Sequence, residues 1–158
     1  NRKFLIKIHD CLSSNIKIDA INSNYQRKSI IKKKDKFKNN LLRELIFNDF
    51  KYHNFVSMSG FTLNLKNNFL TRFNEDKKFN AIEDYDFYLS FLKEGYNFYL
   101  LNLPLIEYGY YYSNYHLSHN KFKMLIKFSR VNLKNFSLIG YPFRIFIWIL
   151  INLKKRIF

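Results

Sequence analysis

A single segment near the middle of the chain constrains the fold most. Residues 82–89 read Ile-Glu-Asp-Tyr-Asp-Phe-Tyr-Leu, which places two adjacent carboxylates at the start of an apolar run. Asn80 and Glu83 have the spacing of a capping box, and Gly95 stands where a glycine commonly ends a helix. We therefore expect a helix over residues 81–94 that buries its apolar side in a core.

Other segments predict strands and helices that alternate along the chain. Extended aromatic or apolar runs, and runs with three- and four-residue spacing, are separated by polar stretches. The expected strands cover residues 4–8, 52–58, 61–63, 97–101 and 105–112, the expected helices cover 37–48, 68–72, 81–94 and 118–134, and a surface loop covers 13–36. This order is typical of an α/β domain in which a mixed sheet is flanked by helices.

Length and composition indicate a folded domain. The chain has 158 residues, enough for one domain with its own core, and 20% of them are aromatic, far too many for a disordered chain. Cys11 is the only cysteine, so no intrachain disulfide can form and we expect a reducing compartment. The sequence starts at Asn1 in an apolar stretch without a signal-peptide pattern. We expect it to be a piece of a longer protein.

The charge balance points to an anionic partner. A formal net charge of +15 favours nucleic acid, an anionic membrane or a phosphorylated substrate. A compositional explanation stands beside it, because the chain is rich in Lys, Asn, Ile, Phe and Tyr and poor in Gly and Pro, as proteins of AT-biased genomes tend to be. The run Lys32–Lys36 is interpreted as a solvated part of the surface loop, with a dedicated binding patch as the alternative.

The carboxylate pair also stands in a characteristic order of segments. Upstream of it residues 68–75 read Asn-Phe-Leu-Thr-Arg-Phe-Asn-Glu, and downstream residues 93–99 read Lys-Glu-Gly-Tyr-Asn-Phe-Tyr, followed by Pro-Leu-Ile at 104–106. Over roughly residues 40–120 this order resembles the C-terminal half of a family 2 glycosyltransferase of the GT-A fold.

The resemblance implies a division of the chain. Residues 1–136 would be the C-terminal portion of a GT-A domain whose N-terminal, nucleotide-binding half is missing. Residues 137–158 would form an apolar and basic helical tail. A fragment of this kind is expected to be inactive without the missing half.

The resemblance assigns catalysis to Glu83 and Asp84. In the family the second carboxylate of this pair takes the proton of the acceptor hydroxyl, so Asp84 is expected to be the base of an inverting, single-displacement transfer, with Glu83 beside it. Such a reaction needs a carboxylate close to the acceptor oxygen, and a helix start fixes its direction and keeps it ionised. Helix capping and surface charge remain the alternative, and they account for Glu83 better than for Asp84.

Metal ligands are not assigned within this chain. Asp84-Tyr85-Asp86 spells the Asp-x-Asp pattern that binds metal and sugar nucleotide in these enzymes, but residues two apart on a helix project about 200° apart. Asp86 is therefore expected behind or beside bound substrate, or on the surface. His116 and His119 are interpreted as surface histidines and His53 as a strand residue. The resemblance implies a divalent cation, Mg²⁺ or Mn²⁺, held mainly by the missing half.

Two other groups are candidates for substrate contacts. Ser59 and Gly60 correspond to the border of the acceptor pocket in the family, where a small residue suits a close ligand. An ordinary bulge or tight turn is the alternative. The aromatic cluster Tyr108–Tyr112 could stack on sugar rings, but clustered aromatics in a strand more often form core or cross-strand pairs.

The C-terminal segment is apolar and ends in basic residues. Residues 145–151 form an uninterrupted apolar run, Pro142 suits the first turn of a helix, and Lys154-Lys155-Arg156 follows. The run is far shorter than the ~20 residues that cross a bilayer. We expect a helix that inserts shallowly at an anionic membrane surface, with packing on the domain or on a partner subunit as the alternative.

Together these features predict the acceptor-side part of a glycosyltransferase for surface polysaccharide such as lipopolysaccharide or capsule. The donor would be a nucleotide-sugar, the acceptor a hydroxyl of a lipid-linked glycan, and the location the cytoplasmic face of the cell membrane. Nucleic acid is not an expected partner in this reading. The alternative is a basic, non-enzymatic module that binds nucleic acid or anionic membrane.

Overall fold

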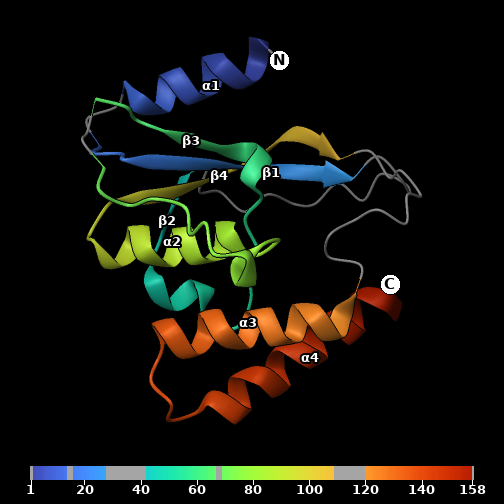
Figure 1. The fold of residues 1–158 in the computed structure, drawn as a ribbon. Helices are drawn as coiled ribbons and strands as arrows, with labels where there is room; N and C mark the ends of the chain where they lie inside the picture. The colour runs from blue at the N-terminus through green and yellow to red at the C-terminus, as the bar shows by residue number, and fades with distance from the viewer. Residues whose placement is uncertain (1, 14–15, 28–41, 67–68, 109–119, 158) are drawn as a thin grey trace. The chain divides into compact units, whose positions relative to one another are not determined.

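The described part of the chain forms two compact units, neither of them continuous in sequence (Figure 1). The computed structural model describes residues 2–13, 16–27, 42–66, 69–108 and 120–157. The sheet unit comprises Asn1–Ile46, Val56–Leu70 and Gly95–Tyr112, and the helical unit comprises Phe47–Phe55, Thr71–Glu94 and Ser113–Phe158.

The sheet unit is built on a mixed four-stranded sheet with the order β2-β4-β1-β3 among the described residues. β1 and β4 pair in parallel, β2 runs antiparallel to β4, and β3 runs antiparallel to β1. The elements of this unit are α1 (Arg2–Leu12), β1 (Ala20–Arg27), β2 (Leu42–Leu45), β3 (Phe61–Leu63) and β4 (Phe98–Tyr108), with a 3-10 turn at Met58–Gly60. The expectation of an α/β fold with a mixed sheet is confirmed.

Helix α1 packs against the sheet, and the strand expected over residues 4–8 is wrong. Ile8 is buried together with Ile21 of β1 and Leu101 of β4, and Cys11 packs against the same cluster. Ile8 and Cys11 lie about one helical turn apart on one face. A window of five residues is too short to show this period, so residues 4–8 taken alone favour a strand.

The central strand β1 lies inside the predicted surface loop over residues 13–36, which is therefore wrong in this part. Its sequence, Ala-Ile-Asn-Ser-Asn-Tyr-Gln-Arg, is mostly polar and does not alternate. This segment is a strand because its backbone forms hydrogen bonds with β4 on one side and β3 on the other. At its start the carboxylate of Asp19 accepts hydrogen bonds from the backbone (2.7 Å) and side-chain (2.9 Å) nitrogens of Asn97. The Lys32–Lys36 run lies outside the described residues.

Two predictions between residues 37 and 58 are also wrong. The helix expected over 37–48 is replaced by strand β2 and by a 3-10 turn at Phe47–Phe50, while residues 37–41 lie outside the described part. The strand expected over 52–58 is irregular apart from its last residue. Over residues 47–58 apolar and aromatic side chains pack from irregular or 3-10 backbone, which has no sequence period of its own.

The predictions that follow are partly confirmed. The extended run at 61–63 is strand β3, whereas residues 69–72 are irregular and not helical. The two strands expected on either side of Pro104 are one strand, β4, with register shifts against β1 near that proline. Residues 109–112 of the aromatic cluster lie outside the described part.

The helical unit confirms the three expected helices of the C-terminal part of the chain. Its elements are α2 (Glu83–Lys93), α3 (Lys121–Asn135) and α4 (Tyr141–Ile157), with 3-10 turns at Phe47–Phe50 and Lys77–Phe79. Gly95 follows α2 with a φ of +83°, as expected for a helix-ending glycine. Pro142 stands in the first turn of α4. The division of the chain expected after residue 136 falls between α3 and α4. Both helices belong to the same unit.

Three stacked aromatic rings join the helices of this unit. The rings of Tyr85 (α2) and Phe128 (α3) have centroids 5.7 Å apart, and those of Phe128 and Trp148 (α4) are 5.3 Å apart. All three side chains are buried. The hydroxyl of Tyr85 also donates a hydrogen bond to the carbonyl of Phe50. Among the described residues, no helix is both long enough and apolar enough to cross a bilayer.

Candidate functional site

Asp84, the expected base, lines a pocket within the helical unit. The pocket has a volume of about 200 Å³ and is bounded by residues 53–54, by the turn at residues 81–82 and by the helices α2, α3 and α4. Its lining residues are His53, Asn54, Ala81, Ile82, Asp84, Tyr85, Lys121, Met124, Phe128, Trp148 and Asn152. A carboxylate, an ammonium group, two amides and aromatic rings therefore meet in one place.

The carboxylate of Asp84 is held by two hydrogen bonds. Its Oδ1 accepts from the backbone N–H of Tyr85 at 2.7 Å, and its Oδ2 accepts from the side-chain amide of Asn54 at 3.0 Å. One donor belongs to α2 and the other to an irregular segment thirty residues upstream. Both oxygens are thus oriented, while the carboxylate remains at the wall of the pocket.

Burial raises the pKa of Asp84 above its ordinary value of 3.8. The hydrogen bond from the Tyr85 amide opposes this shift, the neighbouring charge of Glu83 adds to it, and the Asn54 amide opposes it. A higher pKa means that the ionised carboxylate binds a proton more strongly, which is what a general base requires.

The same shift predicts how pH acts on stability. Because the pKa is higher in the folded state than in the unfolded state, the carboxyl stabilises the fold below pH 3.8, and this contribution is lost as pH rises through the folded-state pKa. We expect Asp84→Asn to gain stability relative to the wild type between pH 3.5 and pH 7. Urea unfolding followed by the fluorescence of Trp148, the single tryptophan, measures this. An opposite trend with pH would mean that hydrogen bonding outweighs burial at Asp84.

Glu83 does not act as the capping residue that the sequence predicted. The N-cap of α2 is Ile82, which makes no side-chain capping bond, and Asn80 instead ends the preceding 3-10 turn. Ala81, between them, has a φ of +68°, so the chain turns sharply before α2. Oε2 of Glu83 is buried without a hydrogen-bond partner in the structure as described. Capping therefore no longer accounts for the presence of Glu83.

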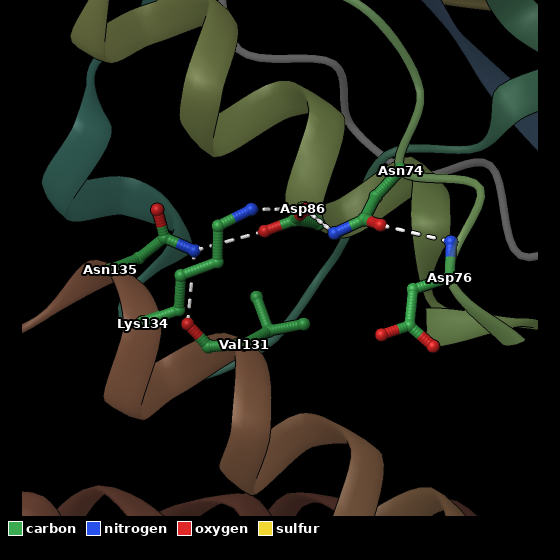
Figure 2. Close-up of polar contacts among 6 residues, drawn as sticks. All are labelled: Asn74, Asp76, Asp86, Val131, Lys134 and Asn135. Atoms are coloured by element: carbon green, nitrogen blue, oxygen red, sulfur yellow. Dashed lines mark hydrogen bonds and ion pairs between the residues drawn. The ribbon is translucent and has the colours of Figure 1, made fainter. Parts of the chain in front are cut away.

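Asp86 is not a surface residue, since only 2% of it is exposed. Figure 2 shows its carboxylate between α2 and α3. One oxygen accepts from the ammonium of Lys134 at 2.7 Å and from the amide of Asn74 at 3.2 Å; the other accepts from the amide of Asn135 at 3.2 Å. Asn135 donates in addition to the carbonyl of Val131. These contacts give Asp86 a structural role in joining three segments of the unit.

The two carboxylates of the Asp-x-Asp pattern thus have separate surroundings. The hydrogen-bond partners of Asp84 belong to α2 and residue 54, whereas those of Asp86 belong to α3 and residue 74. Among the described residues, no group of three or more His, Cys, Asp or Glu side chains could hold a metal ion. His116 and His119 lie outside the described part, and His53 is a pocket residue in irregular backbone, not a strand residue.

Sequence reasoning missed most of the pocket. Asn54, Lys121, Trp148 and Asn152 come from three segments, and only the packing of the helices brings them to Asp84. Of these four residues only Trp148 stands out in the sequence, as the single tryptophan of the chain. No local spacing connects residue 54 to residue 152.

Ser59 and Gly60 belong to the sheet unit, where Gly60 is explained by its own surroundings. A Cβ at Gly60 would meet the backbone oxygen of Ser23 at 2.6 Å and the side-chain oxygen of Asn22 at 3.2 Å. The glycine therefore allows the backbone to pass close to β1, and the side-chain amide of Asn22 donates to the carbonyl of Ser57 nearby at 2.7 Å. This packing accounts for Gly60 without a ligand.

Substitution of Gly60 should consequently destabilise the sheet unit. We expect Gly60→Ala to cost about 2 kcal/mol or more, because the contact is with backbone that cannot rotate away. Hydrogen exchange of the β1 amides measures the change. Gly95→Ala is the control: its φ is +83° but no atom lies within 4 Å, so only the backbone strain of about 1–2 kcal/mol applies. Equal effects at both positions would contradict the steric explanation.

Comparisons with protein-family models, with curated proteins and with solved structures found no match for this chain.

Proposed function

We propose that the chain is the acceptor-side part of a family 2 glycosyltransferase and that Asp84 is its general base. The observation that carries this proposal is the position of Asp84, which lines a pocket, is oriented by two hydrogen bonds and has a raised pKa. The proposal also rests on the order of segments around the carboxylate pair.

In the proposed reaction a hydroxyl oxygen of the acceptor attacks the anomeric carbon of the donor sugar. The new C–O bond forms as the bond to the nucleoside diphosphate breaks, and the hydroxyl proton passes to a carboxylate oxygen of Asp84. Attack from the face opposite the leaving group inverts the configuration of the anomeric carbon. Asn54 and the Tyr85 amide keep the carboxylate in one orientation, which reduces the entropy lost in reaching the transition state.

The remaining lining of the pocket is suited to a sugar ring. Phe128 and Trp148, which stack on each other, form an apolar part of the wall that suits the apolar side of a pyranose. Lys121 and Asn152 supply side-chain donors for hydroxyl groups, and His53 supplies a ring nitrogen. A few polar groups around a largely apolar wall are the usual composition of a small-molecule site.

The donor and the cation enter the proposal through the family resemblance. The donor would be a nucleotide-sugar, and a divalent cation such as Mg²⁺ or Mn²⁺ would neutralise the departing diphosphate. The acceptor would be a hydroxyl of a glycan, carried on lipid. In this proposal residues beyond the present chain hold the nucleotide and the cation.

The experiment that tests the function uses the complete enzyme that the proposal implies. Nucleotide release would be measured with a panel of UDP-, GDP- and dTDP-sugars in the presence of Mn²⁺ or Mg²⁺. Release with one donor, accelerated by a glycan acceptor, is the expected result. Binding of oligonucleotides that falls steeply with salt, without turnover of any donor, would instead favour the basic binding module.

A further inference from the structure

Helix α4 carries an exposed apolar stripe on one side. Phe143, Phe146, Leu150 and Leu153 are each 45–59% exposed. They follow one another at intervals of three, four and three residues, so they lie on the same face of the helix. Four large apolar side chains in a row are more than the scattered single residues that a protein surface normally shows.

The charged residue that interrupts this segment in the sequence is turned inward. Arg144 is only 2% exposed, and its guanidinium donates to the side chain of Asn132 and to the carbonyls of Ile139, at 2.9 Å, and Ser137. Trp148 and Asn152, one and two turns further along, lie on the same inner side and line the Asp84 pocket. The stripe therefore presents no charge to its surroundings along its whole length.

The C-terminal part of the sequence, which contains the stripe, has basic residues and no acidic ones. After Glu107 the sequence contains no Asp or Glu. Of the basic residues that follow, Lys134 pairs with Asp86 and Arg144 is buried, and the others are Lys121, Lys123, Lys127, Arg130, Lys154, Lys155 and Arg156. Three of them follow the stripe directly, in the last turns of α4. An apolar helix face followed in the sequence by a basic segment is complementary to an anionic lipid surface, which offers both hydrocarbon and negative headgroups.

We propose that α4 docks in the plane of an anionic lipid bilayer, with Phe143, Phe146, Leu150 and Leu153 among the acyl chains. The net charge of +15 disfavours a second copy of this chain as the occupant, because two strongly basic molecules repel each other. It does not favour nucleic acid either, since the stripe offers apolar contact and no cation. This inference does not rest on glycosyl transfer.

The geometry of α4 connects the bilayer with the pocket. Its outer face would lie in the membrane while its inner face lines the cavity that contains Asp84. The two faces are separated by about the 10 Å diameter of a helix. A docked α4 therefore holds this pocket close to the lipid headgroups, where a substrate carried on lipid is found.

The first test is co-sedimentation of the 158-residue chain with vesicles. We expect binding to vesicles of phosphatidylcholine with phosphatidylglycerol, and at least about tenfold weaker binding to phosphatidylcholine alone. Phe146→Glu with Leu150→Glu should reduce binding to the anionic vesicles by at least about tenfold. The matched control is Leu65→Glu with Leu70→Glu, a pair of apolar residues in the sheet unit that are 83% and 82% exposed. The control should retain wild-type binding.

The second test moves the single tryptophan across the helix. In Trp148→Phe with Phe146→Trp the indole lies on the stripe, and its emission should shift to the blue when anionic vesicles are added. Wild-type Trp148, stacked on Phe128, should shift little. Circular dichroism verifies that the variant remains folded.

Three results would overturn the proposal. The first is equal loss of vesicle binding in both Glu pairs, which would indicate a general charge effect. The second is a dimer in light scattering that dissociates only in the stripe variant, because a second copy would then cover α4. The third is the absence of vesicle binding at physiological salt. None of these readouts involves a nucleotide-sugar, so they are independent of the proposed function.

Discussion

Asp84→Asn is expected to reduce sugar transfer by the complete enzyme by a factor of about 10²–10⁴, the usual contribution of a general base. The amide cannot take the proton of the acceptor hydroxyl, while its size and its oxygen are retained. That oxygen can still accept from the Tyr85 amide, whereas the Asn54 amide has to rotate because it would face another donor. The loss should therefore appear in kcat and leave KM nearly unchanged. Initial rates of nucleotide release measure both constants.

The control for this experiment is an acidic residue of the same unit outside the pocket. Glu75 is exposed, and Glu75→Gln removes one negative charge from the helical unit as Asp84→Asn does. It should keep full activity. Normal transfer by a folded Asp84→Asn enzyme would remove Asp84 from the chemistry and leave the family proposal standing.

Asn54→Ala removes one hydrogen bond to the base. Its loss should raise the pKa of Asp84 and shift the acidic limb of the kcat–pH profile to higher pH.

Asp86→Ala is expected to lower the free energy of unfolding of the helical unit by about 3 kcal/mol. The substitution removes the acceptor of Lys134, Asn74 and Asn135 at once. The ammonium of Lys134 is half exposed, so water can hydrate it in the variant. The buried amide of Asn135 would retain only its hydrogen bond to the Val131 carbonyl. Most of the cost therefore comes from the buried amide and from the space left between α2 and α3. Urea unfolding followed by Trp148 fluorescence measures it.

Two comparisons separate this explanation from a general effect of losing an acidic residue. Asp76→Ala removes a carboxylate that caps the 3-10 turn at Lys77–Phe79, and should cost only about 1 kcal/mol. Lys134→Met keeps the Asn135 hydrogen bond and should cost less than Asp86→Ala. A cost for Asp86→Ala no greater than that for Asp76→Ala would show that the buried network contributes little.

Asp84 and Asp86 demonstrate how two similar carboxylates acquire different roles. Both were visible in the sequence, two residues apart at the start of one helix. The period of the helix turns them to different sides. One reaches a pocket and is held by two donors, while the other reaches α3 and is held by three side chains. Helix geometry alone predicts that the two carboxylates project to different sides, but the more deeply buried one, Asp86, is decided by its packing on α3.

The helices α2, α3 and α4 were predictable because their signal is local, whereas α1 was missed and the same spacing over residues 37–48 was misleading. In α2 and α3 apolar side chains recur every three or four residues, and Gly95 and Pro142 mark helix boundaries through their own backbone preferences. The capping box at Asn80 and Glu83 was wrong, since the positive φ of Ala81 starts the helix later than the spacing suggested. The first residue of α2 depends on the backbone conformation of Ala81, which the local sequence does not predict.

The sequence by itself determined that this chain is a basic, aromatic α/β protein with a carboxylate pair at a helix start and an apolar C-terminal helix. These properties follow from composition and from periods of a few residues. Only the tertiary structure decided that the polar segment Ala20–Arg27 is a central strand, that Asn54 and Trp148 share a pocket with Asp84, and that Arg144 points inward. The physical reason is that backbone pairing and side-chain burial depend on partners distant in the sequence, and a strand or a pocket exists only once those partners have met.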